Sequence, residues 1–347
     1  MISSPDLMNS RSRLADWVEL RALFSDHGAG EADLASIGRL TSDNHRDREV
    51  DETGSVTEEE ILESDLEETL VRVSEEVGER LLALNTEYPF NVITQPFRLI
   101  LKEVRHFSPA HWTYLFLLLM SAQRDKALPS SSRLEQLVRN GRTLFHACAS
   151  IGVAGLLRNG HTFWFGSPRP DGANFLTALE QLCHEIGYGK AKDAVPPGLP
   201  VHAQDDYIDV IGWPRSRKQR YGNLIVLCQA ATGANWDAKS IIPHIQAFKA
   251  WFDLHPYAMA TASIALPFPA HHEVLEHPEQ GFEAALHNAL NRIENRNGVL
   301  IDRLRIVEAV SDVNSDQASR GKVAGVEQIA ALEDWVRNTM QEISSLV

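Results

Sequence analysis

Short apolar segments alternate with amphipathic helical segments between Thr162 and Leu266, and this order constrains the fold more than any other feature. Strands show apolar runs bounded by turn residues, whereas helices repeat their apolar positions every three or four residues. The expected elements are a strand at 162–165, a helix at 174–187, strands at 207–213 and 224–229, a helix at 236–254 and a strand at 258–266. This order predicts an α/β (α+β) fold with a mixed sheet flanked by helices.

The flanking regions have a more helical pattern. Further helices are expected at 14–24, from Thr57 to beyond Leu81, and at 109–123, 129–157, 282–295 and 326–343, with a hairpin at 88–101 and a strand-like segment at 298–306. The predicted organisation is a short helix plus an acidic flexible linker (1–56), a mostly helical N-terminal domain (57–160), the α/β core (161–266) and C-terminal elements packed on that core (267–347).

The acidity of the chain is concentrated in one segment. The net charge is −14, and the segment from Glu31 to Arg80 holds 17 acidic and 5 basic residues, which leaves 30 acidic and 28 basic residues elsewhere. The rest of the chain is therefore close to neutral and can contact phosphates. The acidic helix is interpreted first as a solvated surface; an acidic docking surface or DNA mimic is the alternative.

Cysteine usage and hydropathy favour a cytoplasmic protein with no membrane segment. Cys148, Cys183 and Cys228 lie in apolar segments without a paired spacing, which is typical of reduced thiols packed as small hydrophobic residues. The first residues lack an apolar signal core, and the apolar run at 114–120 is too short to cross a bilayer.

Asp209 is the strongest candidate for a functional residue. The run Asp-Tyr-Ile-Asp-Val-Ile-Gly-Trp at 206–213 holds this carboxylate in an otherwise apolar strand. Burying a charge is costly unless a partner or a metal ion compensates. A carboxylate that caps a turn or pairs with an arginine at the strand end is the structural alternative.

Gln229 ends the next apolar strand, Leu-Ile-Val-Leu-Cys-Gln at 224–229. If the two strands pair as an antiparallel hairpin, Gln229 and Asp209 meet at the same edge of the sheet. Mg²⁺ prefers oxygen ligands and completes its shell with water and phosphate oxygens, so a carboxylate and an amide oxygen suffice to hold it. A nearby lysine could orient or deprotonate an attacking water.

These two strands and the preceding helix, which ends Ile-Gly-Tyr-Gly at 186–189, resemble the core of the PD-(D/E)xK superfamily, the restriction-endonuclease-like nucleases, and its Mrr-like branch in particular. The resemblance covers residues 163–265. It implies that Asp209 and Gln229 bind Mg²⁺ (or Mn²⁺), and that Glu180, or less closely Glu185, adds a helix carboxylate. The position of the family's lysine holds Ala231, and Lys239, expected one turn into the next helix, is its substitute.

Basic residues near this hairpin are candidates for DNA phosphate contacts, because such contacts dominate non-specific DNA affinity. The candidates are Arg215, Arg217, Lys218 and Arg220 in the hairpin connection and Arg169 in the turn before the helix. A solvated turn is the alternative for the hairpin residues.

The resemblance implies a metal-dependent DNA endonuclease with Asp209, Gln229, Lys239 and Glu180 at its centre, acting in bacterial restriction or anti-phage defence. Such nucleases work with protein partners or as homo-oligomers, and the acidic helix after Thr57 is a candidate docking or self-inhibiting element. The alternative, favoured by Ala231, is an inactive relative that serves as a scaffold or interaction subunit.

Overall fold

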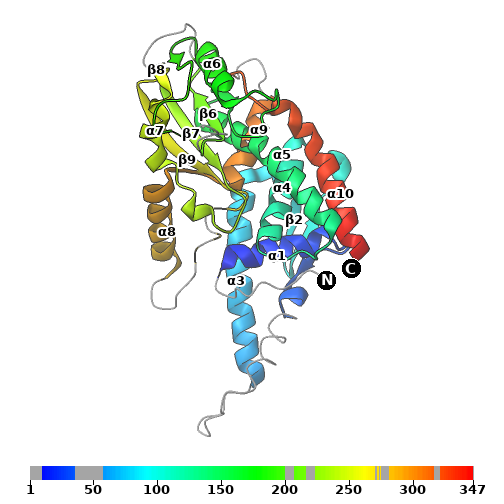
Figure 1. The fold of residues 1–347 in the computed structure, drawn as a ribbon. Helices are drawn as coiled ribbons and strands as arrows, with labels where there is room; N and C mark the ends of the chain where they lie inside the picture. Colours follow the sequence, from blue (N-terminus) through cyan, green and yellow to red (C-terminus); the bar gives the residue numbers. More distant parts are fainter. Residues whose placement is uncertain are drawn as a thin grey trace.

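The structure is a computed structural model that describes residues 10–35, 58–199, 207–215, 223–269, 272, 274, 281–315 and 321–346, with side chains from residue 66 onward in the helix that starts at residue 58. A five-stranded mixed sheet occupies one side of the molecule, and a group of helices occupies the other (Figure 1). The α/β class expected from the sequence is confirmed.

The sheet is built from strands in the order β10 (Val299–Ile301), β9 (Met259–Ala265), β7 (Leu224–Ala230), β6 (Val210–Trp213) and β4 (His161–Trp164). Strands β4, β6 and β7 pair antiparallel in succession, and β7, β9 and β10 run parallel. The predicted hairpin is therefore confirmed, with Val210 opposite Cys228.

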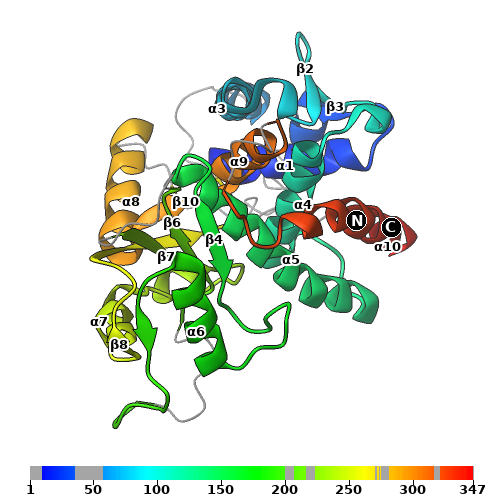
Figure 2. The same ribbon diagram turned by 90° about the horizontal axis from the view of Figure 1, so that it is seen from above.

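Both faces of this sheet are covered by helices (Figure 2). In β7, Ile225 and Leu227 join the core under α6 (Phe175–Ile186) and α7 (Ile245–Lys249), whereas Val226 and Cys228 join the core of α5 (Ser132–Leu156). A strand buried on both faces has no polar side, which explains the unbroken apolar run in its sequence.

Helix α5 packs very close to the sheet. A Cβ atom at Gly212 in β6 would lie 2.3 Å from Val153 Cγ1 of α5, so only glycine fits there without displacement. This contact fixes the distance between α5 and the strand that follows Asp209.

The helical side contains α1 (Arg11–Leu23), α3 (Glu58–Leu84), α4 (Pro109–Arg124), α5, α9 (Arg303–Ser315) and α10 (Ala331–Leu346). A small sheet of β1 (Ala29–Gly30), β3 (Phe97–Leu101) and β2 (Phe90–Thr94) lies beside α1. Helices α9 and α10 pack on α4 and α5, so the C-terminal part of the chain joins the N-terminal helices as well as the sheet (Figure 2).

A buried ionic cluster ties these helices together. Arg80 of α3 contacts Asp16 Oδ1 at 2.7 Å and Glu19 Oε1 at 2.9 Å in α1, and Arg303 of α9 contacts Asp16 Oδ2 at 2.8 Å. Burial raises the pKa of both carboxyls, but for Asp16 the two arginines outweigh burial and its pKa lies well below the usual range. For Glu19 burial prevails and the pKa is raised.

Two predicted elements were wrong. The helix expected at 236–254 is instead a series of short pieces: η3 (Trp236–Ala238), η4 (Ile242–His244), α7 and then β8 (Phe252–Leu254), which pairs with β5 (Lys190–Ala191). Pro243 lies inside this segment, and its missing N–H and ring interrupt a continuous helix.

The strand expected at 298–306 ends at Ile301, and α9 follows. The Asp302 side chain accepts a hydrogen bond of 3.1 Å from the Arg305 N–H, so it caps a helix that the sequence reading missed. The remaining elements are α8 (Phe282–Asn297), η1 (Asn85–Glu87), η2 (Val104–His106) and η6 (Val326–Ala330).

Other predictions are tested only in part. The predicted acidic linker is ordered as far as residue 35, because Ala29 and Gly30 pair with β3 and residues 31–35 are helical; residues 36–57 lie outside the described residues. All three cysteines are free and buried, as expected. Within the described ranges, the helices are all too short or too polar to cross a membrane.

Candidate active site

Asp209 lies directly before β6 and is held by the backbone on both sides. Its N–H donates to the Cys228 carbonyl at 2.9 Å, and its carbonyl accepts from Phe165 N at 2.9 Å and Gly166 N at 2.8 Å. The side chain is buried, with the residue only 4% exposed. The strand pairing that the sequence predicted therefore fixes the carboxylate at the end of the sheet.

The two oxygens of this carboxylate face different partners. Asp209 Oδ2 accepts from the Ala230 N–H at 2.8 Å and from the Gln229 side-chain amide. The other oxygen, Oδ1, lies 3.7 Å from His146 Nε2. Gln229 and Asp209 thus meet as expected, and His146 is a neighbour that the sequence reading did not identify.

Gly166 leaves space for the second oxygen. A Cβ atom at this position would lie 2.5 Å from Asp209 Oδ1, closer than any side chain can approach. Gly166, the first glycine of the turn Gly-Ser-Pro-Arg-Pro-Asp-Gly, therefore belongs to the surroundings of the carboxylate.

Lys239 shares a cavity of about 350 Å³ with Asp209 and Gln229. It follows η3 and does not lie inside an α-helix, so the expected helical placement was wrong although the shared site was expected. The cavity is lined by Arg139, Arg142, Thr143, Phe145, His146, Ser167, Pro168, Asp209, Gln229, Ala230, Thr232 and Lys239.

Helix α5 supplies a stripe of cationic and titratable side chains to this cavity. Arg139, Arg142 and His146 follow one another at spacings of three and four residues, which places them on one face of a helix. The spacing is visible in the sequence, but nothing in the sequence pairs this face with the ends of β6 and β7.

The other predicted residues lie elsewhere. Glu180 on α6 lines a different cavity, with Cys183 and Lys190 among its neighbours, and Glu185 pairs with Lys322 at 2.6 Å. Neither carboxylate lines the cavity of Asp209.

Neither of the two predicted DNA contacts that the structure describes, Arg169 and Arg215, lines this cavity. Arg169 donates to the Ala173 carbonyl at 3.1 Å and stacks over Phe165, and Arg215 is exposed. The positions of Arg217, Lys218 and Arg220 lie outside the described residues.

The side chains of this cavity can supply only part of a metal ion's ligands, so a bound metal ion would need further ligands from the substrate and from water. Among the described residues, no three histidine, cysteine or acidic side chains come together as a metal site. Asp209 is the one acidic residue that lines the cavity, and its Oδ2 already accepts two N–H groups. Mg²⁺ bound by one carboxylate and an amide oxygen needs phosphate oxygens and water to complete its shell.

A half-turn of the Gln229 amide would present its oxygen in place of the nitrogen that now faces Asp209. Two oxygens repel each other at this distance unless a cation lies between them. Metal binding therefore competes with an existing hydrogen bond, and we expect weak affinity in the absence of nucleic acid.

Comparison with models of known families, with curated proteins and with solved structures found no match.

Proposed function

We propose that this chain is a divalent-metal-dependent nuclease of the PD-(D/E)xK type that hydrolyses phosphodiester bonds in DNA. The observation that supports this proposal is the single cavity shared by Asp209, Gln229 and Lys239, although they come from separate segments of the chain. The lysine missing at Ala231 is replaced, in this proposal, by Lys239. Bacterial restriction or anti-phage defence, in concert with protein partners or further copies of the chain, is the proposed biological role.

The cationic side chains would bind the phosphate group. Arg139, Arg142 and Lys239 line the cavity against one carboxylate, so a phosphate that enters it is attracted by several positive charges. Arginine matches two phosphate oxygens at once, and lysine acts as a point charge. These groups stabilise the negative charge that grows on the phosphoryl oxygens during hydrolysis.

Asp209 and Gln229 would hold the metal ion, which when bound supplies Lewis-acid polarisation of the phosphate. Hydrolysis adds water across a P–O bond: the water oxygen bonds to phosphorus, and the leaving oxygen takes up a proton. Lys239 and His146 line the cavity with side-chain nitrogen atoms that could hold or deliver a proton, and His146 Nε2 lies 3.7 Å from Asp209 Oδ1.

The test is cleavage of plasmid and linear DNA with Mg²⁺ or Mn²⁺. We expect cleavage by the wild type and a loss of about 100-fold or more in Asp209→Asn and in Lys239→Ala, as when one electrostatic contact to a transition state is removed. Lys249→Ala is the matched control, because Lys249 is similarly half-buried but does not line the cavity. Cleavage that persists in Asp209→Asn would rule out this site.

The second candidate function is a scaffold or interaction subunit that has lost catalysis. Ala231 at the family's lysine position and the single acidic residue in the cavity favour it. This function predicts a folded protein that cleaves no DNA with any divalent metal, and whose assembly with its partners is unchanged by Lys239→Ala.

A further inference from the structure

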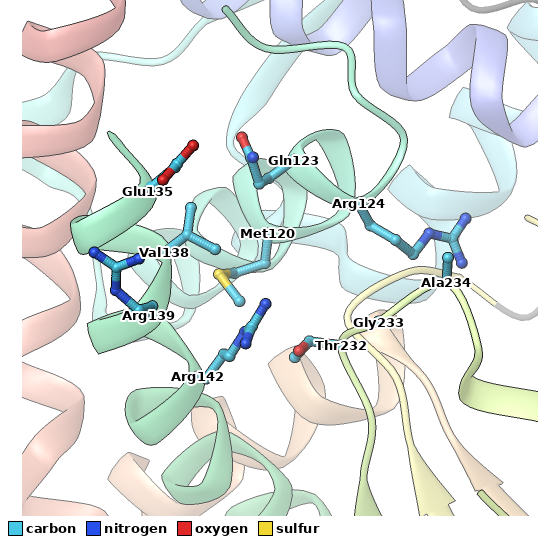
Figure 3. Close-up of a pocket in the computed structure, with 10 residues that line it drawn as sticks. All are labelled: Met120, Gln123, Arg124, Glu135, Val138, Arg139, Arg142, Thr232, Gly233 and Ala234. Atoms are coloured by element: carbon cyan, nitrogen blue, oxygen red, sulfur yellow. The ribbon is translucent and has the colours of Figure 1, made fainter. Parts of the chain in front are cut away.

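A second cavity adjoins the proposed active site. It has a volume of about 410 Å³ and shares Arg139, Arg142 and Thr232 with the first cavity. Figure 3 shows its walls: α4 supplies Met120, Gln123 and Arg124, α5 supplies Glu135, Val138, Arg139 and Arg142, and the loop after β7 supplies Thr232, Gly233 and Ala234. The two cavities therefore meet along one face of α5.

The walls of the two cavities carry more positive than negative charge. Arg124, Arg139, Arg142 and Lys239 stand against Glu135 and Asp209, in a chain whose net charge is −14. Such a local excess of positive charge favours an anionic ligand.

The arginines of the second cavity differ in how far their existing contacts leave them able to bind an anion. Arg124 is held by Asp125 at 2.8 Å and stacks 3.9 Å above the Phe268 ring. Arg139 donates to the neutral Gln136 side-chain oxygen at 2.8 Å, a contact that places no negative charge beside the guanidinium. Arg142 is exposed and makes no ion pair within the part of the chain that the structure describes, and in Figure 3 it points between Met120 and Thr232.

We infer that the second cavity is a phosphate subsite for the DNA strand, occupied by the phosphate next to the one at Asp209. Two adjacent cavities with shared arginines fit a ligand that repeats its anionic group, as a nucleic acid strand does. Arginine side chains and threonine hydroxyl groups are usual phosphate contacts, and both line this cavity. The identity of the strand rests on the proposed function.

The subsite also has an apolar side. Met120 and Val138 are buried and line the same cavity as the arginines. A nucleotide has an uncharged sugar and base beside its phosphate, so a wall of this mixed character suits a nucleotide unit better than a free inorganic anion.

The test compares a ligand with one phosphate and a ligand with two. Thymidine 5′-monophosphate and the 5′-phosphorylated dinucleotide of thymidine are titrated into the full chain by calorimetry in EDTA, where no cleavage occurs. We expect the dinucleotide to bind about 10-fold more tightly, the effect of one additional charge-assisted contact. Equal affinity for the two ligands would overturn the inference.

A matched pair of variants locates the second phosphate. Ala234 is exposed and lines only the second cavity, so Ala234→Glu places a negative charge there and Ala234→Gln places a neutral side chain of the same size. We expect the gain from the second phosphate to disappear in Ala234→Glu and to remain in Ala234→Gln. Loss of the gain in both variants, or in neither, would contradict the assignment.

Glu135→Gln provides a change of opposite sign, since it removes the one acidic residue of the second cavity from an exposed helix position. We expect dinucleotide binding to strengthen a few-fold and mononucleotide binding to change less. One outcome is that the dinucleotide binds more tightly than the mononucleotide, and the variants change this difference as predicted, in a protein that does not cleave DNA with Mg²⁺. That result would support the subsite and refute the proposed nuclease function. Cleavage without such a gain would do the reverse.

Discussion

Replacing Gln229 with glutamate tests the proposed metal site through its effect on the free energy of unfolding. In the wild type the Gln229 amide donates to Asp209 Oδ2, and hydrogen bonds to a charged group contribute about 1.5–3 kcal/mol. In Gln229→Glu this donor is lost above the pH at which the introduced carboxyl ionises, and two carboxylates compete for one site. Two carboxylates this close repel each other unless a cation lies between them.

The expected loss of folding free energy in Gln229→Glu follows from the closeness of the introduced carboxyl to Asp209. A like charge this close raises the pKa of the introduced carboxyl, and a rise of about two units costs about 3 kcal/mol of folding free energy. Because the folded state holds the proton more strongly than the unfolded state, the deficit is absent below a pH of about 4.3 and grows as the pH rises. The variant should match the wild type near pH 4 and be about 3 kcal/mol less stable at pH 8.

Divalent metal should reverse this deficit. Binding to the folded state alone adds about 2.7 kcal/mol at a metal concentration 100 times the dissociation constant. Urea unfolding at pH 4 and pH 8, with and without Mg²⁺, measures both effects. Gln229→Met is the control, since it removes the donor without adding a second carboxylate, so Mg²⁺ should not restore its stability. A glutamate variant that is equally destabilised at both pH values, or indifferent to Mg²⁺, would refute the reasoning.

Three further predictions concern the surroundings of the site and the core. Gly166→Ala should lower both cleavage and stability, because the new Cβ atom would lie 2.5 Å from Asp209 Oδ1 and 2.9 Å from Asp209 Cα, so the carboxylate and its backbone must both move; cleavage rates and thermal melts measure the two effects, and unchanged cleavage would contradict the prediction. Arg80→Met should cost about 3–5 kcal/mol in urea unfolding, because it leaves buried carboxylates uncompensated, whereas Arg337→Gln on the surface should cost less than about 1 kcal/mol; similar losses would argue against a structural role for the cluster. Burial raises the pKa of Cys228 to about 12, so the thiol should resist alkylation at pH 8 until the protein is unfolded; rapid labelling of the native protein, followed by mass spectrometry, would show that the strand opens.

The sequence by itself predicted the strands of the five-stranded sheet, the hairpin of β6 and β7 and the carboxylate at its end. Alternation and apolar runs report how a segment is buried, and an antiparallel hairpin has few registers that keep both faces apolar, so Asp209 and Gln229 had to meet. The ends of two elements were not predicted. Pro243 interrupts the helix expected at 236–254, and Asp302 caps helix α9 where the strand was expected to continue.

Only the tertiary structure decided which side chains lie opposite Asp209 and Gln229. Helix α5 lies far upstream in the chain, yet it brings His146 and two arginines to the strand ends, while Glu180 on the nearer helix α6 lines another cavity. The spacing of Arg139, Arg142 and His146 places them on one face of a helix, but it does not predict which part of the chain lies opposite that face. The cavity arises from the packing of α5 on β6, set by the close contact at Gly212, and such contacts between distant segments leave no local periodicity in the sequence.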